Sequence, residues 1–227
     1  MPVLAKDASA TSRYQQALAA VPAPELPAKA AELVKQAKTR DLATTTVGVT
    51  KAAVTINSAT APSVVGAIAR AVPDMADVAA GAAAAEQPKQ AAAIAKAAAA
   101  AAPSKAGKIV VAVCRAVPKD YRSVAVAVAQ TVPGSAKEVL AAVASAIPEL
   151  KSGVEAALTA YTGDTISVAA ILDQASDSLN GTAAAKGSSA RGPTVGPPFI
   201  PLSGTVTTIT PDTSGEVPTG GRDYAKP

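Results

Sequence analysis

Six prolines recur at an interval of fifteen residues, and this repeat constrains the fold more than any other feature of the chain. Proline inside a helix costs about 3 kcal/mol and a backbone hydrogen bond, so one helix through all six would lose more than the roughly 5–15 kcal/mol that stabilises a domain. Each proline therefore marks a junction between two short elements. The six are Pro73, Pro88, Pro103, Pro118, Pro133 and Pro148.

The segments between the prolines repeat an alanine-rich pattern with aliphatic residues at fixed places. With the proline counted as position zero, the unit that starts at Pro103 carries Ile109, Val113 and Val117 at positions six, ten and fourteen. Steps of four residues bring these side chains to one face of a helix, and alanine is the strongest helix former. Each unit is predicted to be one helix of about 11 residues, and two units to make a hairpin.

Helices are also predicted on both sides of the repeat. Two lie at residues 12–21 and 28–38, and Leu42 to Ala59 holds one or two more, although the β-branched run from Thr44 to Val47 leaves an extended alternative open. A closing helix is predicted over residues 164–179, with Asn180-Gly181 as its stop.

Helix start signals follow several of the prolines. Ser135 and Glu138 have the spacing of a capping box, in which each side chain bonds to a free backbone N–H of the first turn. Asp74, Ser104 and Asp120 stand at comparable cap positions. These residues are predicted to begin the helices of their units.

Composition changes at Thr182, after which Gly, Ser, Thr and Pro dominate as they do in linkers. We predict a helical-repeat domain over residues 1–181 and a flexible tail over residues 182–227, in which Thr205 to Ile209 would extend as a strand on a partner. The predicted fold class is all-α: about nine or ten short helices stacked as hairpins into an α-solenoid-like array.

The residues that usually carry chemistry are scarce. Histidine, the commonest general base and metal ligand near neutral pH, is absent, and Cys114 is the single cysteine. Cys114 is predicted to be a buried or half-buried thiol rather than a nucleophile. The pairs Asp74/Asp77 and Asp173/Asp177 lack a third ligand for a metal. We therefore expect no enzyme and no catalytic, cofactor-binding or metal-binding residues.

The net charge is +4, from 21 basic and 17 acidic residues. Five cations fall in two consecutive units and would form one patch for phosphate, an acidic polymer or a lipid head group, although solvated helix faces look the same. Nucleic-acid binding normally shows a denser basic face with aromatic residues. The candidate anion or partner patch is Lys105, Lys108, Arg115, Lys119 and Arg122.

No signal-peptide apolar region follows Met1. The uncharged stretch from Ala52 to Ala69 contains Pro62 and polar residues, so no membrane span is expected. The protein is expected to be exported or at the cell surface if a leader has been removed, and otherwise cytoplasmic.

The Ala-Val-Pro units between about residues 59 and 161, together with the ending Asp223-Tyr224-Ala225-Lys226-Pro227, give the chain a family likeness. It resembles uncharacterised exported alanine- and proline-rich helical-repeat proteins of Verrucomicrobia-type bacteria. The likeness lies in the amino-acid composition and in one repeated motif, Ala-Val-Pro. It implies an export route and no established activity, while the leader that such proteins carry is not among these residues.

The leading functional hypothesis is a non-catalytic structural or interaction module that presents a surface or assembles with copies of itself. Residues 79–102 are nearly pure alanine on several helix faces, with Glu86, Lys89 and Lys96 as the only charged residues, and an exposed patch of that kind favours self-association. The alternatives are a coat on a lipid or granule surface, although the large apolar residues of interfacial helices are few, and an anion-binding module at residues 105–122. The expected partners are proteins or copies of the chain, and not nucleic acids or small-molecule substrates.

Overall fold

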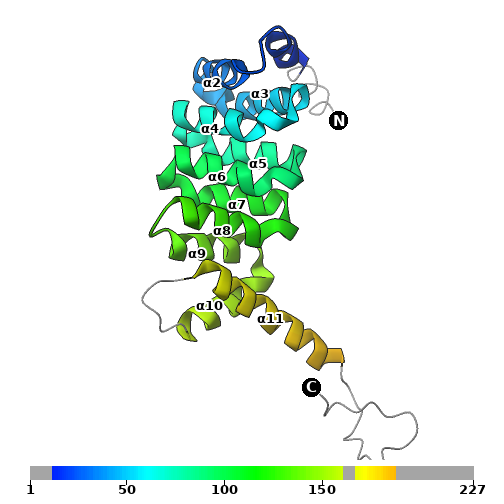
Figure 1. The fold of residues 1–227 in the computed structure, drawn as a ribbon, viewed down its shortest axis with the longest axis vertical. Coiled ribbons are helices and arrows are strands. Elements are labelled where there is room, and N and C mark those ends of the chain that lie inside the picture. Colours follow the sequence, from blue (N-terminus) through cyan, green and yellow to red (C-terminus); the bar gives the residue numbers. More distant parts are fainter. Residues whose placement is uncertain (1–11, 161–166, 188–227) are drawn as a thin grey trace, which may run out of the picture. The chain divides into compact units, whose positions relative to one another are not determined.

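The computed structural model describes residues 12–160 and 167–187, and these residues are all-α, as predicted (Figure 1). No strand occurs within the described ranges. Most of the predicted tail, including residues 205–209 with their alternative of a strand formed on a partner, lies outside them.

Short α-helices alternate with three-residue 3-10 turns through most of the array. A first helix covers residues 12–19. The labelled α-helices are α2 (Leu26–Lys35), α3 (Leu42–Ile56), α4 (Ala61–Ala71), α5 (Ala76–Glu86), α6 (Ala91–Ala101), α7 (Ala106–Ala116), α8 (Tyr121–Thr131), α9 (Ala136–Ala146), α10 (Lys151–Ala160) and α11 (Val168–Gly187). The turns are η1 (Thr39–Asp41), η2 (Ser58–Thr60), η3 (Pro73–Met75), η4 (Pro88–Gln90), η5 (Pro103–Lys105), η6 (Pro118–Asp120) and η7 (Pro148–Leu150).

The proline at each junction explains this alternation. The residue before proline is excluded from the helical region by the proline ring, and Ala102, before Pro103, has φ −134° and ψ 72°. Its N–H still donates to the Ala98 carbonyl at 2.9 Å, and its own carbonyl accepts from the Lys105 N–H at 3.0 Å. One helix is thereby closed and a 3-10 turn is opened, with the proline where no N–H is required.

The unit before Pro73 follows the same pattern without a proline at its junction. Asn57 is extended at φ −147° and ψ 98°, and its side-chain oxygen accepts from the Ala59 N–H at 3.1 Å, which opens η2. Pro62 lies in the first turn of α4, where helices tolerate it. The threonine run of α3 is helical, and Thr46 Oγ1 donates to the Leu42 carbonyl at 2.7 Å.

The predicted helix caps are wrong. Ser135 precedes α9 at φ −81° and ψ 2° rather than in the extended conformation that a capping side chain needs, and its hydroxyl donates backwards to the Val132 carbonyl. Asp74, Ser104 and Asp120 lie inside 3-10 turns, and no side chain caps the helices that follow them. The short connection leaves the first turn without the geometry of a cap.

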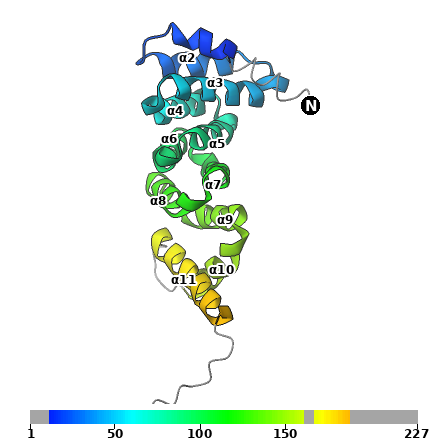
Figure 2. The same ribbon diagram turned by 90° about the vertical axis from the view of Figure 1, so that its right-hand side faces the viewer.

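The helices form two layers. From α2 to α9, alternate helices pack against each other more extensively than consecutive ones do, whereas α10 packs mainly on α11. We call α2, α4, α6 and α8 the even layer and α3, α5, α7 and α9 the odd layer. Figure 2 shows α4, α6 and α8 along one side and α5, α7 and α9 along the other. A helix therefore meets its main neighbour two units, or about thirty residues, along the chain.

The core runs between the layers and is built mainly from alanine and valine. Position six is fully or almost fully buried in all six units, as predicted, whether it holds alanine, isoleucine or valine. Position ten is buried in every unit but the last, where Leu158 is half-buried. These residues are Ala79, Ile94, Ile109, Val124, Val139 and Val154 at position six, and Ala83, Ala98, Val113, Val128 and Val143 at position ten.

The closing helix extends further than the sequence suggested. α11 runs from Val168 to Gly187 and continues through Asn180-Gly181, which was predicted to stop it. A glycine inside a helix costs only about 1 kcal/mol, and the alanines at 183–185 favour continuation. Residue 181, where the domain boundary was predicted, lies inside α11.

A candidate interaction groove across α5, α7 and α9

Neighbouring helices of one layer are in a constant register of 31 residues. Lys105 Nζ lies 2.7 Å from Asp74 Oδ1, and the Gly107 N–H donates to Glu138 Oε1 at 3.1 Å. In the even layer, a Cβ placed on Gly66 would lie 3.7 Å from the Ala97 Cβ. The two residues of each pair are 31 positions apart, so this register identifies the residues that face each other.

One face of α7 is polar at its ends and apolar in the middle. Lys108, Val111, Ala112 and Arg115 follow at steps of three, one and three residues and share this face. Lys108 and Arg115 are exposed, whereas Val111 and Ala112 are half-buried. The opposite face, which includes Ile109 and Val113, packs into the core.

This face of α7 is the floor of an open groove of about 400 Å³ in the odd layer. α5 contributes Asp77, and α9 contributes Glu138 and Ala142. The register of 31 residues places Asp77 opposite Lys108 and Ala142 opposite Val111. The full lining is Asp77, Gly107, Lys108, Val111, Ala112, Arg115, Glu138 and Ala142.

Glu138 closes the groove at the N-terminal end of α7. Gly107 is the second residue of α7, and its N–H has no carbonyl partner within the helix. The Glu138 carboxylate accepts this N–H from the neighbouring helix, where the helix dipole also favours a negative charge. A Cβ on residue 107 would come within 2.6 Å of that carboxylate oxygen, so the close contact depends on glycine.

Lys105, the first residue of the predicted patch, is engaged elsewhere. Its ammonium pairs with Asp74 at 2.7 Å, and this hydrogen bond and the charge of Lys105 lower the pKa of the Asp74 carboxyl. The same pair raises the pKa of Lys105. Lys105 therefore connects η5 to η3 and is not available as a free cation.

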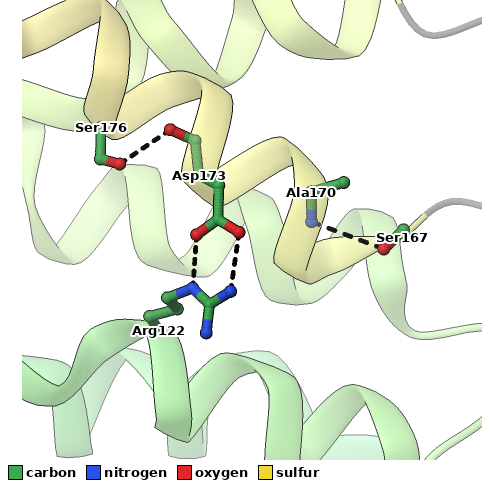
Figure 3. Close-up of polar contacts among 5 residues, drawn as sticks. All are labelled: Arg122, Ser167, Ala170, Asp173 and Ser176. Carbon is green, nitrogen blue, oxygen red and sulfur yellow. Dashed lines mark hydrogen bonds and ion pairs between the residues drawn. The ribbon is translucent and has the colours of Figure 1, made fainter. Parts of the chain in front are cut away.

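Arg122 belongs to the other layer. It projects from α8 to α11, where its guanidinium holds both carboxylate oxygens of Asp173, with Nη2 at 2.7 Å from Oδ2 (Figure 3). The hydrogen bonds from Arg122 lower the pKa of Asp173. This bidentate pair ties the closing helix to the array and uses the charge that the patch would need.

The five predicted residues therefore do not form one free basic surface. Lys108 and Arg115 share the groove, Lys119 is exposed in η6, and Lys105 and Arg122 are paired with acids. Sequence reasoning missed the acidic and apolar members of the groove: Asp77, Gly107, Val111, Ala112, Glu138 and Ala142. Their one sequence signal is the spacing of 31 residues, which joins Asp77 to Lys108 and Gly107 to Glu138.

Cys114 is a core residue. It is fully buried on the inner face of α7, as the sequence predicted, and burial raises the pKa of its thiol to about 12. A thiol in this state is protonated near neutral pH and is not a nucleophile.

Within residues 12–160 and 167–187, no three Asp, Glu, Cys or His side chains gather as metal ligands. None of the helices in these ranges is long and apolar enough to cross a membrane.

A second hollow, of about 300 Å³, lies where α8 and the start of α9 meet the start of α11. Its lining includes Val126, Gln130, Gly134 and Val168 and has no charged side chain. Unlike the α7 groove, it therefore has no charged group to select a ligand.

No protein-family model, no curated protein and no solved structure matches this chain.

Proposed function

We propose that this chain is a non-catalytic helical-repeat scaffold that binds protein partners through the outer faces of its helices. The observation that carries the proposal is the contrast between inner and outer positions of the unit. Position six is buried and apolar in every unit, whereas position twelve is exposed in every unit and changes in size and charge. Position twelve holds Ala85, Ala100, Arg115, Gln130, Ser145 and Ala160.

A binding scaffold built from repeats needs constant residues at its buried positions and variable residues on its outer surface. Each unit must pack on its neighbours, and its outer side chains are free to suit a ligand. The carboxyl groups with lowered pKa support the same interpretation, because Glu32, Asp74 and Asp173 each face a cation on the surface and none lines the groove. Catalytic sites instead bring groups of shifted pKa together in a pocket.

Self-association has less support than binding to other proteins. Of the alanines between residues 79 and 102, only Ala85, Ala93 and Ala100 are fully exposed, and most of the others lie in the core. The exposed cations and the exposed acid of this stretch interrupt the apolar surface further; they are Glu86, Lys89 and Lys96. The apolar patch that would drive assembly is therefore small.

A coat on a lipid surface also has less support. The aliphatic faces of the helices pack against one another, and Ile56 is the one large apolar side chain that is exposed among the described residues. Interfacial helices need a free face of bulky apolar residues.

Selection from a phage-displayed library of random peptides tests the proposal. The folded full chain is the target, and the same chain unfolded in urea serves for counter-selection. We expect peptides that bind the folded array alone. If no sequence is enriched on the folded chain over the unfolded one, the scaffold proposal is wrong. Light scattering after size-exclusion chromatography provides the control for self-association, and we expect a monomer.

A further inference from the structure

The charges at the two ends of the α7 groove differ in whether they are compensated. At the N-terminal end, the register places the Asp77 carboxylate opposite Lys108, although the two form no direct ion pair, and the Glu138 carboxylate accepts the Gly107 N–H. Arg115 lies at the other end, two helical turns away. It makes no ion pair with any residue that the structure describes, and the register places Ala146 of α9 opposite it.

The middle of the groove is apolar and shallow. Val111, Ala112 and Ala142 form its floor without a charged side chain between Lys108 and Arg115. Seven residues of helix separate these two cations, or about 10 Å at 1.5 Å per residue. An extended peptide rises about 3.3 Å per residue, so roughly three residues cover this distance.

The charge pattern favours one class of ligand. A polyanion such as DNA or a sulfated polysaccharide would meet Asp77 and Glu138 in the same groove, and like charges in contact are unfavourable. A single carboxylate at the Arg115 end of the groove avoids both acids, because the register places Ala146 rather than an acid opposite Arg115. The planar guanidinium of arginine binds carboxylates in a bidentate manner. Because the groove is open, a chain can enter at one end and leave at the other.

We infer that the α7 groove binds an extended segment of a partner protein through an Asp or Glu side chain on Arg115 and an aliphatic side chain over Val111, Ala112 and Ala142. This inference rests on the proposed scaffold function and assigns the surface and the partner chemistry. The aliphatic group loses its exposed area to the floor, and the acidic group supplies the counter-charge that the array itself does not place there.

The test uses the full chain and two acetylated, amidated peptides, Ala-Leu-Ala-Glu-Ala and its matched partner Ala-Leu-Ala-Gln-Ala. Binding is followed by NMR chemical shifts of the backbone and methyl groups. We expect the glutamate peptide to shift Val111, Ala112 and Ala142 together with Arg115, and the glutamine peptide to bind about tenfold more weakly, since hydrogen bonds between charged groups are the stronger ones.

Two variants separate the charge from the floor. Arg115→Gln should weaken the glutamate peptide about tenfold and leave the glutamine peptide unchanged. Val111→Ser should weaken both peptides equally. Arg70→Gln is the matched control, because Arg70 has the same place in its own unit and is exposed, but lies on α4 outside the groove. It should have no effect, and circular dichroism confirms that each variant is folded.

Several results would overturn the inference. These are no shift with the glutamate peptide up to its solubility limit, equal effects of Arg70→Gln and Arg115→Gln, or tighter binding of duplex DNA or heparin at the same residues. The scaffold proposal is tested separately, since library peptides that bind the folded array elsewhere would support it even if the groove assignment failed.

Discussion

α5 and α7 are neighbours in the odd layer and have the same length, yet their sequences differ at most positions. The inner face of α5 is all alanine, and the same positions of α7 hold isoleucine, valine and cysteine. Both faces are fully buried. These positions are therefore apolar in both helices, while the size of the buried side chain differs between them.

The outer faces of the same two helices differ more. At position twelve, α5 has Ala85 and α7 has Arg115, and both are exposed. At position eight, α5 has Gly81 and α7 has Val111. The same repeat unit therefore accommodates small outer side chains on α5 and larger or charged ones on α7. Under the proposed function, recognition would therefore belong to particular units and not to every repeat.

The largest effect is expected when α7 is made to resemble α5 in the core. Ile109→Ala should lower the free energy of unfolding by about 2–5 kcal/mol, because it leaves a cavity at a fully buried position of the core. Urea unfolding measures the change. Ile94→Val is the milder control in the even layer and should cost about 0.5–1.5 kcal/mol.

The reverse exchange places the larger core residue of α7 into α5. Ala79→Ile gives α5 the residue that α7 has at the same position, but Ala79 is fully buried, so the larger side chain must displace its neighbours. Overpacking should cost about 1–3 kcal/mol. A gain in stability from Ala79→Ile would mean that α5 is loosely packed and that the two helices are equivalent after all.

A second close approach lies at the C-terminal end of the array. A Cβ on Gly153 of α10 would lie 3.0 Å from both the Cα and the carbonyl oxygen of Ala175 in α11. These are backbone atoms, so Gly153→Ala must push the two helices apart and should cost about 1–3 kcal/mol. Thermal unfolding followed by circular dichroism measures it; an unchanged or raised midpoint would show that α11 can move away freely.

The even layer offers the opposite result for the same substitution. A Cβ on Gly66 would lie 3.5 Å from the Ala97 carbonyl oxygen, which is ordinary contact, so Gly66→Ala should raise stability by roughly 0.5–1 kcal/mol through helix propensity. On Gly81, at the contact of α5 with α7, the distance to the Ala112 Cβ is 3.3 Å. Gly81→Ala should therefore gain less. Equal gains at the two sites would mean that the layers are packed alike.

The sequence predicted the helices well because the proline signal is local. Each of the six regularly spaced prolines follows the end of one helix and precedes the start of the next, so the length of the units and the buried face that contains Ile109 could be predicted. The β-branched run at residues 44–47 was correctly preferred as helix. In the repeat units, the positions of the small apolar residues were enough to predict which face of each helix is buried.

The caps and the groove were not predictable in the same way. Whether Ser135 caps a helix depends on the backbone angles of its turn, and those are set by the short junction. Glu138 was assigned to its own helix but contacts Gly107, 31 residues earlier. The patch at residues 105–122 was read from neighbouring sequence, whereas the structure pairs Lys105 and Arg122 with acids on distant helices. These contacts could be predicted only if it were known which residues of neighbouring helices face each other.

The smallest expected effect concerns the ion pair that joins the turns before α5 and α7. The pKa of Asp74 lies below its ordinary value of 3.8 in the folded state because Lys105 donates to it. Its stabilising contribution is therefore complete above the ordinary value and is lost as the pH falls through the lowered folded pKa. The pKa of Lys105 lies above 10.5, so the alkaline loss begins only as the pH rises beyond that value.

Urea unfolding as a function of pH, at low and high salt, measures this contribution. Asp74→Asn should remove part of the acid-side loss, and the effect should shrink in high salt because the side chain of Asp74 is 78% exposed. Glu149→Gln, at an exposed acid without an ion pair among the described residues, is the control and should leave the profile unchanged. If Asp74→Asn and Glu149→Gln change the profile equally, Asp74 does not hold the Lys105 ammonium in solution. Lys105 would then add to the cations Lys108 and Arg115 on the surface around α7.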